Sequence, residues 1–343
     1  MNWIVRIATY ALVAMLVIPF LLLALVLSPV AIPLILLARF NRRHAHGHPR
    51  HWLRAKFGRG LGVAELARRL QVEEVDLRKL EPYYRKERIP KRRGGERELH
   101  VPDRETKELQ RRILHLLLAK LRTHDSCCGF EPGRSIVHNA LPHVGRAVVV
   151  RMDIVDFFPA TSSERVEAYF RRVGWNREAA RLLTRLCTWQ GGLPQGAPTS
   201  PRLANLVNYR LDVALARLAA RGRGSYTRYA DDLTFSFPVD RPKRVRGLIQ
   251  RTRGSLRTLG YELHEREKLH IRRSHQRQVV TGLVVNEKVQ LTRERRRWLR
   301  AIKHRLATGR DVTLSDSSLQ GWLALDSMIE QQAGAAVPNE SDA

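Results

Sequence analysis

The sequence predicts an α+β fold preceded by a membrane-spanning segment, and three observations support this. Apolar residues make up 43% of the 343-residue chain, which is enough to bury a sizeable core in about two domains. After residue 60, helical and strand-like runs mix without a regular βαβ repeat, which favours an α+β domain over a parallel sheet. Ahead of them, the run from Ile7 to Leu37 is apolar and carries no charged side chain.

That apolar run predicts a transmembrane anchor over residues 1–40. A helix of this length exceeds the roughly 30 Å of a hydrocarbon core, so one kinked or tilted span is favoured over a short hairpin. Cations are concentrated after the run, so the positive-inside rule predicts a single-pass protein of the inner membrane, with its remainder in the cytoplasm. Residues 41–59 form a basic juxtamembrane linker rich in His and Arg, suited to anionic headgroups, with metal binding as the alternative.

The charge balance indicates the partners of the rest of the chain. Lys and Arg number 61 against 33 Asp and Glu, which gives a formal net charge of +28. A folded domain this basic favours nucleic acid or an anionic membrane face as its partner. The three cysteines are too few and too unevenly spaced for a disulfide scaffold or a zinc site.

Periodicity places the main elements after the linker. Residues 62–80 predict two short helices that lead into a larger domain, with a DNA-reading helix-turn-helix as the alternative. The other expected helices are Leu109–Leu121, Ser163–Val173, Arg177–Thr188 and Leu203–Ala219, and the expected strand-like runs are Ala147–Phe158 and Tyr226–Phe237.

Acidic residues in the two strand-like runs are candidate metal ligands. Asp231 and Asp232 are adjacent at a predicted hairpin turn, where two like charges repel each other unless a cation lies between them. Asp153 follows the apolar residues of the earlier run and supplies a third carboxylate. Three such groups would hold two Mg²⁺ ions, although an isolated Asp-Asp pair is more often a solvated loop tip.

A Gly- and Pro-rich loop and three sequence blocks identify the family. The loop Gly192–Pro201 precedes a helix and would let backbone approach a nucleotide closely. MDIVDFF, LPQGAPTSP and YADD, in this order and spacing, resemble the palm of reverse transcriptases. Further segments resemble the family's fingers and last palm blocks, so that the resemblance covers about residues 60–310: Tyr83–Pro102, Leu109–Leu118, Gly129–His143, Gly260–His270 and Val280–Asn286.

Two shorter elements resemble one branch of that family, the retron reverse transcriptases of bacteria. Asn139 and His143 match an NAxxH element, and Val280, Thr281 and Gly282 match a VTG element. The membrane anchor departs from the pattern, because retron enzymes are usually soluble, and this leaves the physiological role open.

The resemblance implies a right-handed fingers-palm-thumb polymerase with defined segments. Residues 60–146 would form N-terminal helices and fingers, 147–285 the catalytic palm, 286–334 a short basic thumb and 335–343 a disordered tail.

It also implies roles for individual residues at the reaction centre. Asp153, Asp231 and Asp232 would bind two Mg²⁺ ions, with Mn²⁺ as a substitute and the Ile154 carbonyl as a further ligand. Lys268 would protonate pyrophosphate.

Around that centre, the resemblance implies contacts with nucleotide and RNA. Phe158 matches the steric gate against a 2′-hydroxyl, while Phe157 is expected in the core. The remaining nucleotide-binding residues would be Gln195, Gly196, Lys91, Arg97 and Arg134, and the RNA-binding residues would be Asn139, His143, Val280, Thr281, Gly282, Arg296 and Arg300.

The function implied is RNA-directed DNA synthesis from deoxynucleoside triphosphates on a structured noncoding RNA. The product would be a branched RNA–DNA molecule serving anti-phage defence, with an effector protein as a further partner. Two alternatives stay open: a bacterial defence reverse transcriptase that uses no retron RNA, and a membrane-tethered RNA-binding scaffold with little catalysis. The intact acidic triad and Gln195 speak against the scaffold.

Overall fold

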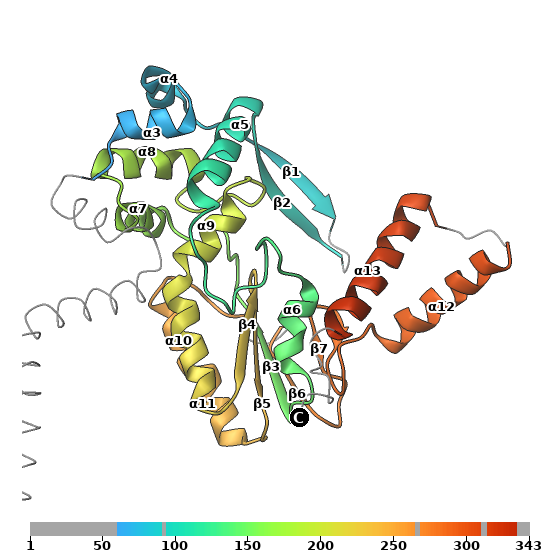
Figure 1. Cartoon of the computed structure of the whole chain (residues 1–343). Helices are drawn as coiled ribbons and strands as arrows, with labels where there is room; N and C mark the ends of the chain where they lie inside the picture. Colours follow the sequence, from blue (N-terminus) through green and yellow to red (C-terminus); the bar gives the residue numbers. More distant parts are fainter. Residues whose placement is uncertain (1–59, 91–93, 265–267, 310–313, 335–343) are drawn as a thin grey trace, which may run out of the picture.

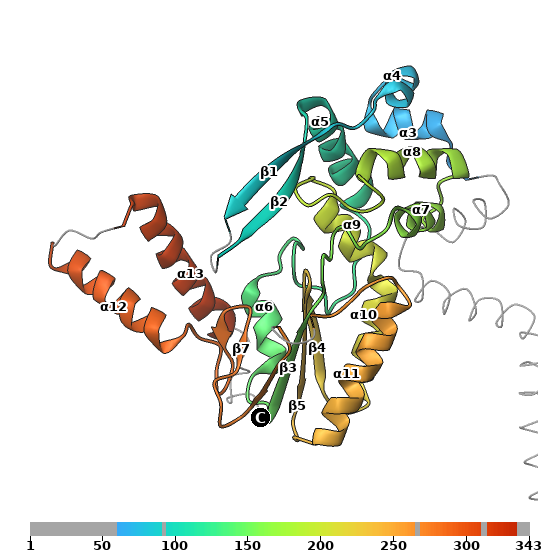
Figure 2. The ribbon, with the colours of Figure 1, turned by 180° about the vertical axis from the view of Figure 1, so that it is seen from behind.

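A computed structural model describes residues 60–90, 94–264, 268–309 and 314–334 of the chain (Figure 1). A four-stranded sheet with helices against it forms the lower part of the view, a helical region with a hairpin lies above it, and a helical pair extends to the side (Figures 1 and 2). We refer to these parts as the palm, the fingers and the thumb.

The palm sheet is antiparallel throughout, with strand order β4-β5-β3-β6. Its strands are β3 (Val148–Asp153), β4 (Ser225–Tyr229), β5 (Asp232–Phe237) and β6 (His270–Arg273). In the register of β3 and β5, Val148 lies opposite Phe237, and Asp153 lies opposite Asp232. This pairing brings together two carboxylates that are far apart in the sequence.

Side chains alternate across the sheet and give it two different faces. Val148 and Val150 join the large hydrophobic cluster that also contains the β5 residues Leu233 and Phe235. Val149 points the other way and joins a second cluster, around the base of the thumb. We call these the helix face and the open face. By alternation, Asp153 shares the open face with Val149.

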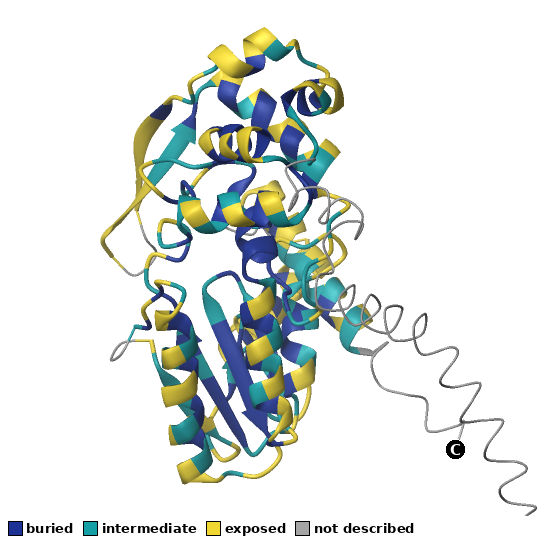
Figure 3. Ribbon diagram, turned by 90° about the vertical axis from the view of Figure 1, so that its left-hand side faces the viewer, coloured by how far each residue is buried: buried dark blue, intermediate teal, exposed yellow. Residues whose placement is uncertain are grey.

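Helices pack against both faces of the sheet, and β3, β4 and β5 are largely buried (Figure 3). Against the helix face lie α10 (Tyr209–Ala220) and α11 (Pro242–Arg257), which contribute to the same cluster as the strands, and α9 (Ser200–Val207) precedes them. Against the open face lie the short helices α6 (Ile136–Ala140) and η2 (Leu141–His143), which contact β4.

The fingers combine helices with a two-stranded hairpin, β1 (Tyr84–Pro90) and β2 (Glu96–Pro102). Asp103 and Asn176 cap α5 and α8 by accepting hydrogen bonds from the backbone N–H groups of Thr106 and Ala179. The helices of this region are α3 (Val63–Leu70), α4 (Glu74–Lys79), α5 (Arg104–Arg112), the π-helix η1 (Ile113–Leu118), α7 (Ser163–Arg172) and α8 (Arg177–Cys187).

The thumb begins after a small hairpin, β7 (Val279–Val280) and β8 (Leu283–Val284). Thr281 and Gly282 form its two-residue turn, with φ angles of 45° and 85°. Positive φ at both positions matches the twist of a tight hairpin, which explains the glycine. Two helices follow, α12 (Arg293–Ala307) and α13 (Asp316–Gly334).

The structure confirms most of the expected elements and corrects several boundaries. Residues 62–80 do form two short helices, α3 and α4. The helix expected over Leu109–Leu121 starts earlier and turns into a π-helix, and the one expected over Leu203–Ala219 is divided at Asn208. The strand expected over Ala147–Phe158 ends at Asp153, and the β1–β2 hairpin was not expected as strands.

The predicted membrane anchor (1–40), linker (41–59) and tail (335–343) lie outside the described residues. Among the helices that are described, none combines the length and apolar composition needed to cross a bilayer. The anchor therefore stays a prediction.

Candidate active site

The acidic residues meet at one end of the palm sheet. Ala230 and Asp231 connect β4 to β5, with Ala230 in a left-handed conformation at φ 57°. The Asp231 carbonyl accepts a hydrogen bond of 3.0 Å from the Ile154 N–H, which ties this turn to the end of β3. Asp153 and Asp232 face each other across the β3–β5 pair. We call Ala230–Asp231 the acidic turn.

Basic side chains partly neutralise the acidic residues. Arg151, two residues before Asp153 on the same strand, forms an ion pair with Asp232. Lys268 donates to the Asp153 carboxylate at 2.8 Å, and His264 lies 3.4 Å from the same oxygen. Two of the three carboxylates are thus paired with a cation of the protein.

The pKa values of the acidic pair reflect how it is buried. Burial raises the pKa of Asp231, and the nearby charge of Asp153 raises it further. Burial also raises the pKa of Asp232, and Arg151 opposes this effect. The ionised forms are therefore disfavoured, and a bound cation would stabilise them.

The donors fit a divalent cation by their chemistry, since carboxylate oxygens are the ligands that Mg²⁺ and Mn²⁺ take in proteins. Within the described ranges, however, no group of three or more His, Cys, Asp or Glu side chains is arranged to hold a metal ion. Asp153 and Asp232 instead form ion pairs with Lys268 and Arg151. Binding a cation would require those ion pairs to open or to be shared.

Aromatic rings lie beside the acidic turn. Phe158 is 6.1 Å from Phe130 between ring centroids, and Phe130 is 6.3 Å from Tyr229, the residue just before the turn. Phe158 is only partly buried, as a steric gate must be, whereas Phe157 is 4% exposed and lies in the core as expected.

The predicted nucleotide loop is attached to the backbone of Phe158. Leu193 N–H donates to the Phe158 carbonyl at 3.2 Å, and the Gln195 carbonyl accepts from His100 of β2 at 2.7 Å. Gly196 has φ 125°, and a Cβ there would lie 2.9 Å from the His100 carbonyl, so only glycine fits. The structure thus brings Phe158, Gln195 and Gly196 together between palm and fingers.

The predicted fingers cations are less closely placed. Arg97 lies on β2 and Arg134 follows the loop that carries Phe130, and both side chains are exposed. Lys91 lies outside the described residues. Their contacts with triphosphate or template stay predictions.

The residues of the NAxxH element are buried in the protein. His143 is fully buried and its two ring nitrogens lie 2.7 Å from the Ser236 hydroxyl and 2.8 Å from the Thr227 hydroxyl. Burial lowers its pKa to about 3, so the ring is neutral at pH 7. Asn139 is 1% exposed. The structure gives His143 the role of joining η2 to β4 and β5, and contact of either residue with RNA stays a prediction.

The other predicted RNA-binding residues lie near the thumb. Val280 is fully buried, while Thr281 donates to the Ile136 carbonyl at 3.1 Å and Gly282 is exposed at the hairpin tip. Arg296 and Arg300 are exposed on α12 and line a groove of about 410 Å³ between α12 and α13. Because both side chains are exposed, their guanidinium groups are accessible to a ligand in this groove.

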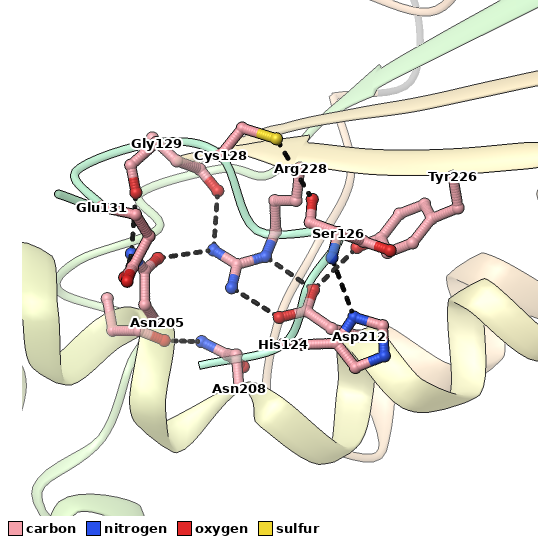
Figure 4. Close-up of polar contacts among 12 residues, drawn as sticks. His124, Ser126, Cys128, Gly129, Glu131, Asn205, Asn208, Asp212, Tyr226 and Arg228 are labelled. Atoms are coloured by element: carbon pink, nitrogen blue, oxygen red, sulfur yellow. Dashed lines mark hydrogen bonds and ion pairs between the residues drawn. The ribbon is translucent and has the colours of Figure 1, made fainter. Parts of the chain in front are cut away.

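Sequence reasoning missed several residues around the acidic turn. Arg151 and His264, which contact Asp232 and Asp153, were not expected there. Arg228 was also missed, although it is fully buried and paired with Asp212 (Figure 4). Strand alternation was the available signal, because a charged residue on the apolar side of a strand requires a buried partner.

Acidic residues paired at the ends of palm strands, next to an aromatic residue and a Gly–Pro loop, are the arrangement that the resemblance to reverse transcriptases predicts. Residues 89–279 match the family model described as "Reverse transcriptase (RNA-dependent DNA polymerase)". The chain belongs to the reverse transcriptase family.

The curated relatives place it among the retron reverse transcriptases. It is 42% identical to the retron Mx65 reverse transcriptase of Myxococcus xanthus over 263 residues, which cover 71% of this chain and 61% of the relative. It is 35% identical to the retron Mx162 enzyme of the same organism over 311 residues, 81% of this chain and 63% of the relative. Identity to the Escherichia coli retron Ec86 enzyme is 34% over 238 residues, 69% of this chain and 73% of the relative. The alignments thus span less than two thirds of the two M. xanthus relatives.

Proposed function

We propose that this chain is an RNA-directed DNA polymerase that copies a structured noncoding RNA with deoxynucleoside triphosphates. The observation that carries this proposal is the pairing of β3 with β5, which sets Asp153 opposite Asp232 and next to Asp231. Membership of the reverse transcriptase family supports the same reaction.

The residues of the site have separable roles in this proposal. Asp153, Asp231 and Asp232 would hold the divalent cations once the ion pairs with Lys268 and Arg151 open or are shared. Bound Mg²⁺ would activate the primer hydroxyl and stabilise the pyrophosphate leaving group. Lys268, released from Asp153 when the carboxylate binds a cation, would be free to protonate pyrophosphate. Phe158 would exclude a 2′-hydroxyl, and Gln195 would contact the incoming nucleotide.

Primer extension tests the reaction. Purified protein is given an RNA template annealed to a DNA primer, with deoxynucleoside triphosphates and Mg²⁺, and extension is followed with time. We expect template-dependent DNA synthesis that EDTA abolishes and that Mg²⁺ or Mn²⁺ restores. Absence of extension by a folded, RNA-free preparation on this substrate would contradict the proposed activity.

We further propose a retron-type product, a branched RNA–DNA molecule. Its support is the similarity to retron reverse transcriptases and the presence of the NAxxH and VTG elements. Nucleic acid purified with the protein from its native host should contain DNA covalently joined to RNA, detected by sequencing before and after RNase and debranching treatment. Recovery of unlinked RNA alone would favour a defence reverse transcriptase of another type.

The anti-phage role, the effector partner and the membrane anchor are proposals of the same kind. The anchor rests on the apolar run Ile7–Leu37. An integral anchor should keep the full chain in the membrane fraction after a 1 M salt wash, which screens electrostatic attachment to a range of roughly 3 Å. Deleting residues 1–40 should release an active polymerase but abolish phage protection that needs the membrane. Full-length protein in the soluble fraction would contradict the anchor.

A further inference from the structure

Arg228 and Asp212 form a buried ion pair next to the acidic turn, and Figure 4 shows the pair with its neighbours. Arg228 of β4 and Asp212 of α10 are both fully buried, and two hydrogen bonds of 2.8 and 2.7 Å join them side by side. Tyr226 donates to the same carboxylate at 2.8 Å, and the Asn205 side-chain oxygen accepts from Arg228 Nη1 at 3.1 Å. Asp212 and Asn205 thus hold the guanidinium directly, and Tyr226 holds the Asp212 carboxylate.

The same guanidinium reaches the acidic turn. Arg228 Nη1 also donates to the Ala230 carbonyl at 3.2 Å. Ala230 has φ 57°, a conformation that costs a residue with a Cβ about 1 kcal/mol or more and needs support from its surroundings. Its carbonyl belongs to the peptide that leads into Asp231, so this hydrogen bond fixes the direction in which that aspartate leaves the strand.

A second segment of the chain also contacts the turn. Gly129, in the loop between η1 and α6, packs against the turn so closely that a Cβ would lie 2.7 Å from the Ala230 nitrogen. Its φ is not in the left-handed region, so the contact, rather than backbone freedom, requires glycine. The Asn205 side-chain nitrogen donates to the Gly129 carbonyl at 2.8 Å, so one amide joins both supports.

We propose that Arg228 and Gly129 are positioning residues for the reaction: together they clamp the acidic turn and hold the Asp231 carboxylate where it binds Mg²⁺. This rests on the proposed polymerase function. Both residues would act through the backbone of Ala230, which is the part of the turn that they contact.

Stability alone is a weak explanation for this arrangement. Burying two charges is expensive, and well-packed apolar residues in their place would often serve a core equally well. An apolar side chain at residue 228 would, however, leave the Ala230 carbonyl without its donor. A role in positioning the acidic turn explains why residue 228 is an arginine and not an apolar residue.

The test compares Gly129→Ala and Arg228→Lys with Tyr226→Phe as the matched control. Gly129→Ala adds a Cβ that must displace the acidic turn. Arg228→Lys keeps the positive charge but loses the guanidinium group that bonds to Asp212 and Ala230 together. Tyr226→Phe removes one hydrogen bond from Asp212 and leaves both contacts with Ala230 in place. Each protein is assayed by primer extension over a range of Mg²⁺ concentrations, with kcat, the KM for nucleotide and Tm measured alongside.

We expect both clamp variants to lower kcat at least about tenfold and to raise the half-saturating Mg²⁺ concentration at least about threefold, with a smaller change in nucleotide KM. Tyr226→Phe should change the Mg²⁺ dependence less than twofold. Wild-type Mg²⁺ dependence in a folded Gly129→Ala protein would overturn the proposal, and so would an equal shift in Tyr226→Phe. If Arg228→Lys does not fold, the Mg²⁺ dependence of Gly129→Ala tests the proposal by itself.

A separate readout distinguishes this inference from the proposed function. The rise in Tm caused by Mg²⁺ needs no polymerisation, and it should be smaller in Gly129→Ala than in the wild type or in Tyr226→Phe. If the wild type gives no primer extension, the polymerase assignment fails. If extension occurs but the three variants respond alike, only the clamp fails.

Discussion

Two aspartates next to the palm sheet, Asp212 of α10 and Asp231 of the acidic turn, are in opposite electrostatic environments. On the helix face, Asp212 is fully buried, and it accepts hydrogen bonds from Arg228 and Tyr226. At the end of the open face, Asp231 is surrounded by Asp153 and Asp232, and burial raises its pKa. Arg228 compensates the charge of Asp212 within the protein. The charge of Asp231 would be compensated by a bound cation. Burial of a carboxylate therefore indicates structure or function according to its partners.

Replacement of Asp212 gives the largest expected effect on stability. Asp212→Asn would leave Arg228 as an uncompensated buried charge, which typically costs about 3–5 kcal/mol. Urea unfolding of both proteins at pH 7 measures this difference in the free energy of unfolding. Asp125→Asn is the control, because the Asp125 side chain is 73% exposed and pairs with Arg122 at the surface. A loss below about 1 kcal/mol in Asp212→Asn would remove the contrast between the faces.

Replacement of Asp231 should have the opposite effect to replacement of Asp212: activity should fall, and stability should not. Asp231→Asn keeps the size of the side chain and removes a charge needed for the metal, so primer extension should fall about 100-fold or more. Activity within a few-fold of wild type would refute the assignment of Asp231 as a metal ligand.

The stability of the same variant follows from the direction of the pKa shift. Because the folded-state pKa of Asp231 is raised, its contribution to stability is fully present below the unfolded pKa and is lost as pH rises through the folded value. At pH 7 without metal, Asp231→Asn should therefore unfold at the same Tm as the wild type or a few degrees higher. A Tm several degrees lower would show that the Asp231 charge supports the fold.

His143 is fully buried against the open face of the sheet, where its ring contacts Thr227 and Ser236. Burial lowers its pKa to about 3, so its contribution to stability is present above the unfolded pKa of about 6.5 and is lost as pH falls toward 3. Unfolding free energy attributable to this residue should fall by about 2 kcal/mol between pH 7 and pH 5. His143→Gln should unfold with a shallower pH dependence, whereas substitution of the exposed His304 should leave it unchanged. Parallel pH profiles for wild type and His143→Gln would contradict this role.

The smallest expected effect concerns sugar selection at the edge of the site. Phe158→Val should admit ribonucleotides, with discrimination reduced about tenfold or more, because the clash with a 2′-hydroxyl is removed. The ratio of kcat/KM for deoxy- and ribonucleotides measures it. Phe157→Leu is the control, since Phe157 lies in the core and should affect stability without changing the ratio. If the ratio is the same in Phe158→Val and wild type, another side chain forms the gate.

The sequence predicts the parts of this site that lie in continuous motifs. The adjacent Asp231 and Asp232, Asp153 after an apolar strand, and the Gly–Pro loop around Gln195 are visible as spacing and composition. The structure adds the register, in which Asp153 faces Asp232, and this depends on strand pairing across a long stretch of chain.

Contacts between distant segments are what the sequence did not reveal. The role of Arg228 depends on its ion pair with Asp212, which lies on another element. The need for glycine at residue 129 depends on its contact with the acidic turn. His143 was expected to contact RNA because of its motif, but side-chain burial is decided by packing of η2 on β4 and β5. The division of the Leu203–Ala219 helix at Asn208 likewise reflects a tertiary contact, because the Asn208 side chain donates to Tyr261.

We propose that the acidic turn binds a divalent cation and that the protein is less stable without metal because of it. The most direct test of this proposal is the thermal unfolding of wild type and Asp231→Asn, measured over a range of Mg²⁺ concentrations at pH 7. We expect Mg²⁺ to raise the Tm of the wild type in a saturable manner, whereas Asp231→Asn should start at an equal or higher Tm and should not respond. An equal rise of Tm in both proteins would contradict it.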